Sequence, residues 1–145
     1  LQAIHEADVI VYGIGSLYTS IMPNLIVDGV VEQLRSNPVK KIYFCNAMTQ
    51  PGETDDFTLE DHVAAIQKHS FSEAVDIVIT HNNRAQRHIL EKYKDMGSEP
   101  VRVAQEEHSY QILYRDVLNF DDDLIRHDSN KIRDVLGEII NSKDE

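Results

Sequence analysis

Apolar runs and polar turns alternate along this chain in the order typical of α/β proteins. The runs at 9–12, 41–45 and 74–80 are short, and the first is rich in β-branched residues, so they predict strands. The run at 9–12 predicts a strand that is buried on both faces, as in a parallel sheet. Residues 24–35, 58–68 and 84–96 carry apolar side chains at helical spacing and predict helices between and after these strands.

Local signals mark where these helices start and stop. The helix over 24–35 is expected to end at Ser-Asn-Pro at 36–38, and its inward stripe consists of Ile26, Val27, Val30, Val31 and Leu34. Thr58 and Asp61 resemble a capping box for the next helix, with Val63, Ala65 and Ile66 inward. Gly97 suits the residue just after a helix end, and Pro100 blocks continuation of the helix.

The last third of the chain carries weaker signals. Val101–Val103 is expected to form a short strand, and residues 111–118 form a strand or a short helix, of which the strand is favoured. The acidic run at 121–123 predicts a solvated turn. A final helix over 130–141 is expected, with Asp128 or Ser129 as its cap and a frayed tail after Ser142. Its inner face consists of Ile132, Val135, Leu136, Ile139 and Ile140.

Strands alternating with helices predict βαβ units with right-handed crossovers and a mainly parallel sheet. The fold class is therefore α/β, a Rossmann-like three-layer α/β/α arrangement. Ligands of such sheets bind outside the carboxyl ends of the strands. The loops at 13–20, 46–56 and 80–84 all follow strands, so we expect them to converge on one crevice.

Composition narrows the class of protein. The 145 residues suit one domain, and 41% hydrophobic with 27% charged residues is ordinary for a globular chain. A net charge of −11 argues against nucleic acid or an anionic membrane as a partner. No apolar run reaches the length of a membrane span. The single Cys45 is expected to be a buried, inert thiol in a reducing, cytoplasmic compartment.

The loop after the first strand is the first candidate site. Its glycines can expose backbone N–H groups, its hydroxyls add donors, and Pro23 suits the first turn of the helix that follows, which together favour a phosphate or diphosphate. The alternative is a tight turn whose glycines only supply positive φ. The candidate residues are Gly13, Gly15, Ser16, Leu17, Thr19, Ser20 and Asn24.

Further polar residues follow the next two strands. Asn46, Thr49, Gln50 and Asn82 are neutral groups that both donate and accept hydrogen bonds, which suits a sugar or a base. The alternative for Asn46 and Asn82 is that they satisfy nearby backbone. Carboxylates of the second loop could hold Mg²⁺ on a bound phosphate, or could simply be exposed; they are Glu53, Asp55 and Asp56.

Arg126 and Tyr93 are two further candidate ligand contacts. Arg126 is a natural phosphate partner in an acidic chain, with Asp128 to orient it, and the alternative is a surface ion pair. Tyr93 could stack on a base, or could be a core residue at helical spacing.

Four stretches together resemble one family. They are Gly-Ile-Gly-Ser-Leu-Tyr-Thr-Ser-Ile-Met-Pro-Asn-Leu at 13–25, Asn-Ala-Met-Thr-Gln-Pro-Gly-Glu-Thr at 46–54, Asp-His-Val at 61–63 and Arg-His-Asp at 126–128. The chain resembles the bacterial gluconeogenesis factors (YvcK-like proteins), which are relatives of the archaeal 2-phospho-L-lactate transferases (CofD). Ile14 stands where the family is expected to have proline.

The resemblance implies that residues 1–145 are the C-terminal half of a larger Rossmann-type domain whose N-terminal half carries a glycine-rich loop. It implies a regulatory factor that binds a UDP-sugar such as UDP-N-acetylglucosamine and serves gluconeogenic growth, cell-wall synthesis and cell shape. Tyr93 and Arg126 match family positions associated with that ligand. A regulatory protein partner and a homo-oligomer are expected, and no catalytic residue is assigned. The alternative is an Mg²⁺-dependent transferase of a phospholactyl-type group from an activated nucleotide.

Overall fold

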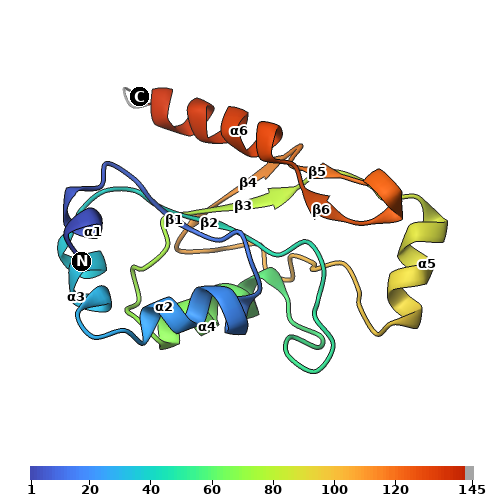
Figure 1. Cartoon of the computed structure of the whole chain (residues 1–145), viewed down its shortest axis with the longest axis horizontal. Helices are drawn as coiled ribbons and strands as arrows, with labels where there is room; N and C mark the ends of the chain where they lie inside the picture. Colours follow the sequence, from blue (N-terminus) through green and yellow to red (C-terminus); the bar gives the residue numbers. More distant parts are fainter. Residues whose placement is uncertain (143–145) are drawn as a thin grey trace.

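A four-stranded parallel sheet organises the computed structural model, which describes residues 1–142. Its strand order is β1-β2-β3-β4. The strands are β1 (Ile10–Tyr12), β2 (Lys41–Phe44), β3 (Ile77–His81) and β4 (Gln111–Arg115). Each strand lies beside its predecessor in sequence (Figure 1), which places the carboxyl ends of all four strands at one edge of the sheet.

Helices cover both faces of the sheet, as Figure 1 shows. Helix α6 (Ser129–Asn141) lies on one face, and α2 (Met22–Leu25) and α4 (Leu59–Lys68) lie on the other. Helices α1 (Gln2–Glu6) and α3 (Val30–Ser36) pack together at one end, and α5 (Arg87–Asp95) lies at the opposite end. The three-layer α/β/α prediction is confirmed.

A small antiparallel ribbon precedes α6. It pairs β5 (Leu118–Asn119) with β6 (Arg126–His127), and the short 3₁₀ turn η2 (Asp121–Asp123) lies between them. The acidic turn predicted at 121–123 is thus confirmed. The strand favoured over 111–118 is also confirmed, because β4 occupies most of it.

The core divides into two apolar clusters, one on each side of the sheet. Tyr43 packs with Leu17, Val63 and Ile66 under α4, whereas Ile42 and Phe44 belong to the cluster under α6. This division follows from the alternation of side chains along a strand. Because both faces of β2 are covered, all four of its residues are buried.

The structure corrects the prediction for the first strand. Within the described residues β1 has a strand neighbour on one side only, so it is an edge strand. Its central residue, Val11, is 37% exposed, and the prediction of burial on both faces was wrong. A β-branched run indicates a strand but does not say how many neighbours that strand has.

The helix predicted over 24–35 is interrupted. Helix α2 ends at Leu25 and α3 begins at Val30, with Gly29 at φ 83° between them. Ile26 and Val27, predicted to face inward, are 72% and 55% exposed. Gly29 is the cause, because its left-handed backbone conformation is incompatible with a continuous helix. The predicted end at Ser-Asn-Pro is confirmed.

Two further predictions were wrong. Val101–Val103 is not a strand, although the Val101 N–H donates to the Ala47 carbonyl and the Leu59 N–H donates to the Arg102 carbonyl, each at 2.9 Å. These bonds join the segment to the second motif loop and to the first residue of α4 rather than to the sheet. Ile140 is 40% exposed and does not share the buried side of α6.

The capping predictions are confirmed. Thr58 and Asp61 form a reciprocal capping box on α4. The Asp128 side chain caps α6 by accepting from the Asn130 and Lys131 N–H groups. Gly97 ends α5 with φ 81°, and the N–H of Ser98 donates back to the Tyr93 carbonyl at 2.9 Å. The predicted tail after Ser142 lies outside the described residues.

A buried carboxylate anchors the loop between Val103 and β4. Glu60 of α4 accepts hydrogen bonds from the backbone N–H groups of Ala104 and Gln105 and from His108 Nε2 at 2.8 Å. The Glu60 and His108 side chains are each 9% exposed. Although burial alone raises the pKa of Glu60, these hydrogen bonds outweigh it and lower the pKa to about 2.

Candidate functional site

The first two sequence motifs meet at the carboxyl edge of the sheet. They enclose a cavity of about 480 Å³, which we call the motif pocket. Five predicted site residues line it: Gly15, Asn46, Thr49, Gln50 and Tyr93. The remaining lining residues are Ile14, Ala47, Met48, Pro51, Met96, Ser98, Ile125 and His127.

Asn46 joins the two motif loops at the base of this pocket. Its Oδ1 accepts from the Tyr43 hydroxyl at 2.8 Å, and its Nδ2 donates to the Gly15 carbonyl at 2.9 Å. Tyr43 is fully buried in the sheet, so Asn46 ties the glycine loop to the core. One N–H of the Asn46 amide is left over for a ligand.

Gly15 is required by close packing. A Cβ at this position would lie 2.7 Å from the Ser20 Cβ, well inside van der Waals contact. The chain turns here from β1 into the π-helical turn η1 (Leu17–Ile21), which brings Ser20 back over Gly15. The glycine thus lets the first motif fold tightly beside the pocket.

Hydrogen bonds to the segment after α5 hold the second motif in place. The N–H of Thr49 donates to the Glu99 carbonyl at 2.7 Å, and Thr49 Oγ1 accepts from the Glu99 N–H at 2.9 Å. The Ser98 hydroxyl donates to the Thr49 carbonyl at 2.6 Å. The Thr49 hydroxyl oxygen therefore accepts within the fold, and these bonds fix this part of the pocket wall to the segment after α5.

Three further side chains offer polar atoms to the motif pocket. The Tyr93 hydroxyl accepts from the Ile125 N–H at 2.9 Å, which leaves its own O–H to donate. Within residues 1–142 the side chains of Gln50 and His127 have no hydrogen-bond partner. Burial lowers the pKa of His127, and the nearby His81 lowers it further, so both favour the neutral imidazole.

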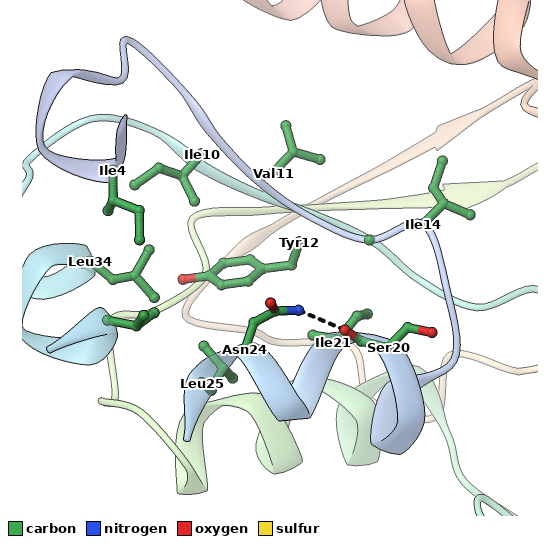
Figure 2. A pocket seen from close by; sticks show the side chains of 12 residues that line it. Ile4, Ile10, Val11, Tyr12, Ile14, Ser20, Ile21, Asn24, Leu25 and Leu34 are labelled. Carbon is green, nitrogen blue, oxygen red and sulfur yellow. Dashed lines mark hydrogen bonds between the residues drawn. The ribbon is translucent and has the colours of Figure 1, made fainter. Parts of the chain in front are cut away.

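Other predicted site residues line a second cavity on the opposite side of the glycine loop. This β1 groove, of about 270 Å³, lies between β1, α2 and α3 and includes Gly13, Ser20 and Asn24 (Figure 2). The Asn24 Nδ2 donates to the Ser20 carbonyl at 2.7 Å. The groove is mainly apolar, and the Tyr12 hydroxyl is buried within it without a partner among the described residues.

The remaining predicted site residues lie outside both cavities. Ser16 and Thr19 hydrogen-bond to each other through their hydroxyls, and Leu17 is a core residue. Asn82 is exposed at the end of β3 and does not join the motif pocket. Arg126 is exposed on β6 and does not line the motif pocket. The third loop lines a neighbouring cavity through His81 and Asn83.

The candidate magnesium ligands are exposed loop residues. Asp55 accepts from the Gly52 N–H at 2.8 Å and so stabilises its own turn. None of Glu53, Asp55 and Asp56 lines the motif pocket. Within residues 1–142 no cluster of three or more His, Cys, Asp or Glu side chains could hold a metal ion.

Cys45 is buried as predicted. Burial raises the pKa of its thiol to about 12, which makes it a poor nucleophile. None of the helices in residues 1–142 combines the length and hydropathy that a bilayer crossing needs.

Sequence reasoning missed the apolar wall of the pocket and His127. Met48, Met96 and Ile125 resemble ordinary core residues in the sequence, so no signal marked them. His127 stands in the Arg-His-Asp stretch at 126–128, in which the arginine is the more typical phosphate ligand. A two-residue strand is too short for its alternation to be read from the sequence.

The family model described as 2-phospho-L-lactate transferase CofD matches residues 1–118. This chain belongs to the CofD family. The match includes both motif loops and all four strands of the sheet.

Curated relatives match almost the whole chain. It is 36% identical over 143 residues to the gluconeogenesis factor of Bacillus subtilis, covering 97% of this chain and 45% of that protein. It is 39% identical over 141 residues to the gluconeogenesis factor of Halalkalibacterium halodurans, covering 94% of this chain and 43% of that protein. A crystal structure of a UPF0052 family member from Bacillus halodurans matches with a TM-score of 0.85 at 38% identity. The match covers 92% of this chain and 44% of that protein. The chain thus spans less than half the length of each of these relatives.

Proposed function

We propose that this chain supplies part of the binding site for a nucleotide sugar, with UDP-N-acetylglucosamine as the candidate, in a regulatory factor for gluconeogenic growth in bacteria. The observation that carries the proposal is the meeting of both motifs in one pocket. Gln50, Tyr93 and one Asn46 N–H offer neutral hydrogen-bonding groups there, which suit sugar hydroxyls and a base. The names of the gluconeogenesis factors support the physiological role.

A role in cell-wall synthesis and cell shape, action through a protein partner, and a homo-oligomer belong to the same proposal. We also propose that the chain is the C-terminal half of its Rossmann-type domain. The open edge of β1 and the coverage of less than half of each relative support this division. In that arrangement Arg126 and the β1 groove are available to ligand or protein outside the motif pocket.

The alternative is a transferase of a phospholactyl-type group, which the description of the family model favours. Such an enzyme needs a carboxylate or a metal close to the phosphate. Among residues 1–142 no carboxylate lines the motif pocket, and this supports binding over transfer.

The test is a thermal-shift titration of this chain and of the longer protein in which it occurs, with UDP-N-acetylglucosamine, UDP and a GDP control. A ligand that binds only the native state stabilises it by about 2.7 kcal/mol at a hundredfold excess over Kd. The shift should be smaller in Tyr93→Phe, which loses the free O–H, and in Arg126→Ala. No shift with any nucleotide would contradict the proposal, and turnover of a nucleotide donor would favour the transferase.

A further inference from the structure

The motif pocket contains no permanently charged side chain. Its lining within the described residues includes no Lys, Arg, Asp or Glu, and the chain as a whole carries a net charge of −11. His127 is the one lining side chain that can become cationic near neutral pH. A ligand with phosphate groups would therefore meet positive side-chain charge in this pocket only through His127.

A second imidazole stands close to His127. His81 ends β3, and its Nδ1 donates to the Asn83 carbonyl at 3.1 Å, which leaves Nε2 as an acceptor. Asn83 Oδ1 accepts from the Leu118 N–H at 3.3 Å, and Leu118 pairs with His127 across the β5–β6 ribbon. Asn83 thus brings the ends of β3 and β6 together, and a charge on either imidazole opposes a charge on the other.

The other ionisable groups around His127 are already engaged. Tyr93 of α5 uses its hydroxyl oxygen for Ile125. Asp128 accepts from the first N–H groups of α6. Arg126, its other neighbour along the strand, is exposed and does not line the motif pocket. Lys131 of α6 donates to the Leu118 carbonyl of the ribbon at 2.6 Å and is paired with Asp116 at 2.8 Å.

We propose that His127, backed by His81, contacts the phosphate groups of the ligand and takes up one proton from solvent when the ligand binds. The pocket then acquires its positive charge together with the anion. Without ligand, burial and the neighbouring imidazole keep His127 neutral. The identity of the ligand in this inference rests on the proposed function.

Proton uptake makes binding depend on pH in a defined direction. An anion beside His127 raises the pKa of the imidazole, so the bound form holds more protons than the free form. Affinity therefore rises as pH falls from about 8 towards about 5.5, by about tenfold for each unit of pKa change on binding. The diphosphate of a UDP-sugar keeps its charge over this range, so the effect reports on the protein.

The experiment is calorimetric titration of the chain with UDP-N-acetylglucosamine at several pH values, in buffers of different ionisation enthalpy. Histidine NMR with sulfate, an anion that does not titrate in this range, is the second probe. His127→Gln should bind more weakly at low pH and lose the proton uptake. His81→Gln should take up fewer protons, because His127 is then more easily charged in the free protein. His88→Gln is the control, because His88 is exposed on α5 beside Asp123.

The outcomes separate this inference from the proposed function. Binding of the UDP-sugar without proton uptake, or with uptake unchanged in His127→Gln, would overturn the role of His127 and leave the proposed function standing. A rise in the His127 pKa with sulfate, but no nucleotide binding, would retain His127 as an anion contact and remove the nucleotide sugar. If neither probe binds, both proposals fail.

Discussion

Two polar centres of this molecule contain a histidine, and they differ in how completely they are satisfied. At the Glu60 centre, which comprises Glu60, His108 and the N–H groups of 104–105, the carboxylate accepts from all three of these donors. In the motif pocket the polar atoms of Gln50 and His127 face a cavity of about 480 Å³ and have no partner within the described residues.

This difference distinguishes a centre that stabilises the fold from one that can bind a ligand. A buried charge whose hydrogen bonds are complete fixes a loop and has nothing left to offer a ligand. Polar atoms that line a cavity without partners cost little only while water or a ligand can reach them. Substitutions at the Glu60 centre should therefore change stability, and substitutions around the pocket should change binding.

The largest effect is expected at Glu60. Glu60→Gln keeps the shape of the side chain but replaces a carboxylate by an amide that can accept fewer of the three donors. We expect a loss of about 3 kcal/mol in the free energy of unfolding, measured by urea denaturation. The matched control is Glu91→Gln, which removes an exposed ion pair with Arg87 and should cost less than about 0.5 kcal/mol. Equal effects would contradict the distinction.

The Glu60 centre should also produce an acid limb of stability. The pKa of Glu60 is about 2 in the folded state, below its ordinary value of 4.5, so the unfolded chain binds the proton first. Its stabilisation is fully present above about pH 4.5 and is lost as pH falls towards 2, at most about 3 kcal/mol in all. Glu60→Gln should lack this limb. A separate loss starting below about pH 6.5 should remain, because burial lowers the pKa of His62.

Gly15→Ala tests the close packing beside the pocket. The added Cβ would meet Ser20, so we expect a loss of about 2 kcal/mol and weaker ligand binding. Gly137→Ala is the control, because a Cβ in this part of α6 meets nothing within 4 Å. It should stabilise the protein by about 0.5–1 kcal/mol. If Gly15→Ala has no effect on stability, the glycine loop is looser than the structure implies.

Asn46→Ala should have the smallest effect on stability. It should change both stability and ligand binding, because Asn46 is bonded within the fold and also lines the motif pocket. It removes the bond to the Gly15 carbonyl and leaves the Tyr43 hydroxyl without its acceptor. We expect a loss of about 1–2 kcal/mol in urea denaturation together with reduced binding. A loss of binding without any loss of stability would make Asn46 a ligand contact alone.

Much of the fold could be predicted because its signals are local. The apolar run at 41–45 and the capping box at Thr58 and Asp61 depend only on neighbouring residues, and both are confirmed. The exposed position of Val11 could not be predicted, since it depends on which strands lie beside β1. The apolar spacing over 24–35 is continuous through Gly29, so it predicts one helix although a glycine inside a helix is costly.

The site was predictable only in part, for a related reason. Parallel strands bring their carboxyl ends together, and this placed the two motifs in one pocket correctly. The side of a two-residue strand that faces a cavity is set by tertiary packing, so Arg126 and His127 could not be told apart. Thr49 and Asn46 satisfy backbone as well as lining the pocket, a double use that composition cannot reveal.

The open edge of β1 has a consequence for the colloidal behaviour of this chain. An unpaired edge with exposed Val11 and Ile14 can pair with another copy, and the net charge of −11 opposes that approach. The range of this repulsion shrinks from about 30 Å at 0.01 M salt to about 8 Å at 0.15 M. Self-association should therefore grow with ionic strength, so the oligomeric state of this chain is a property of the solution as much as of its surface.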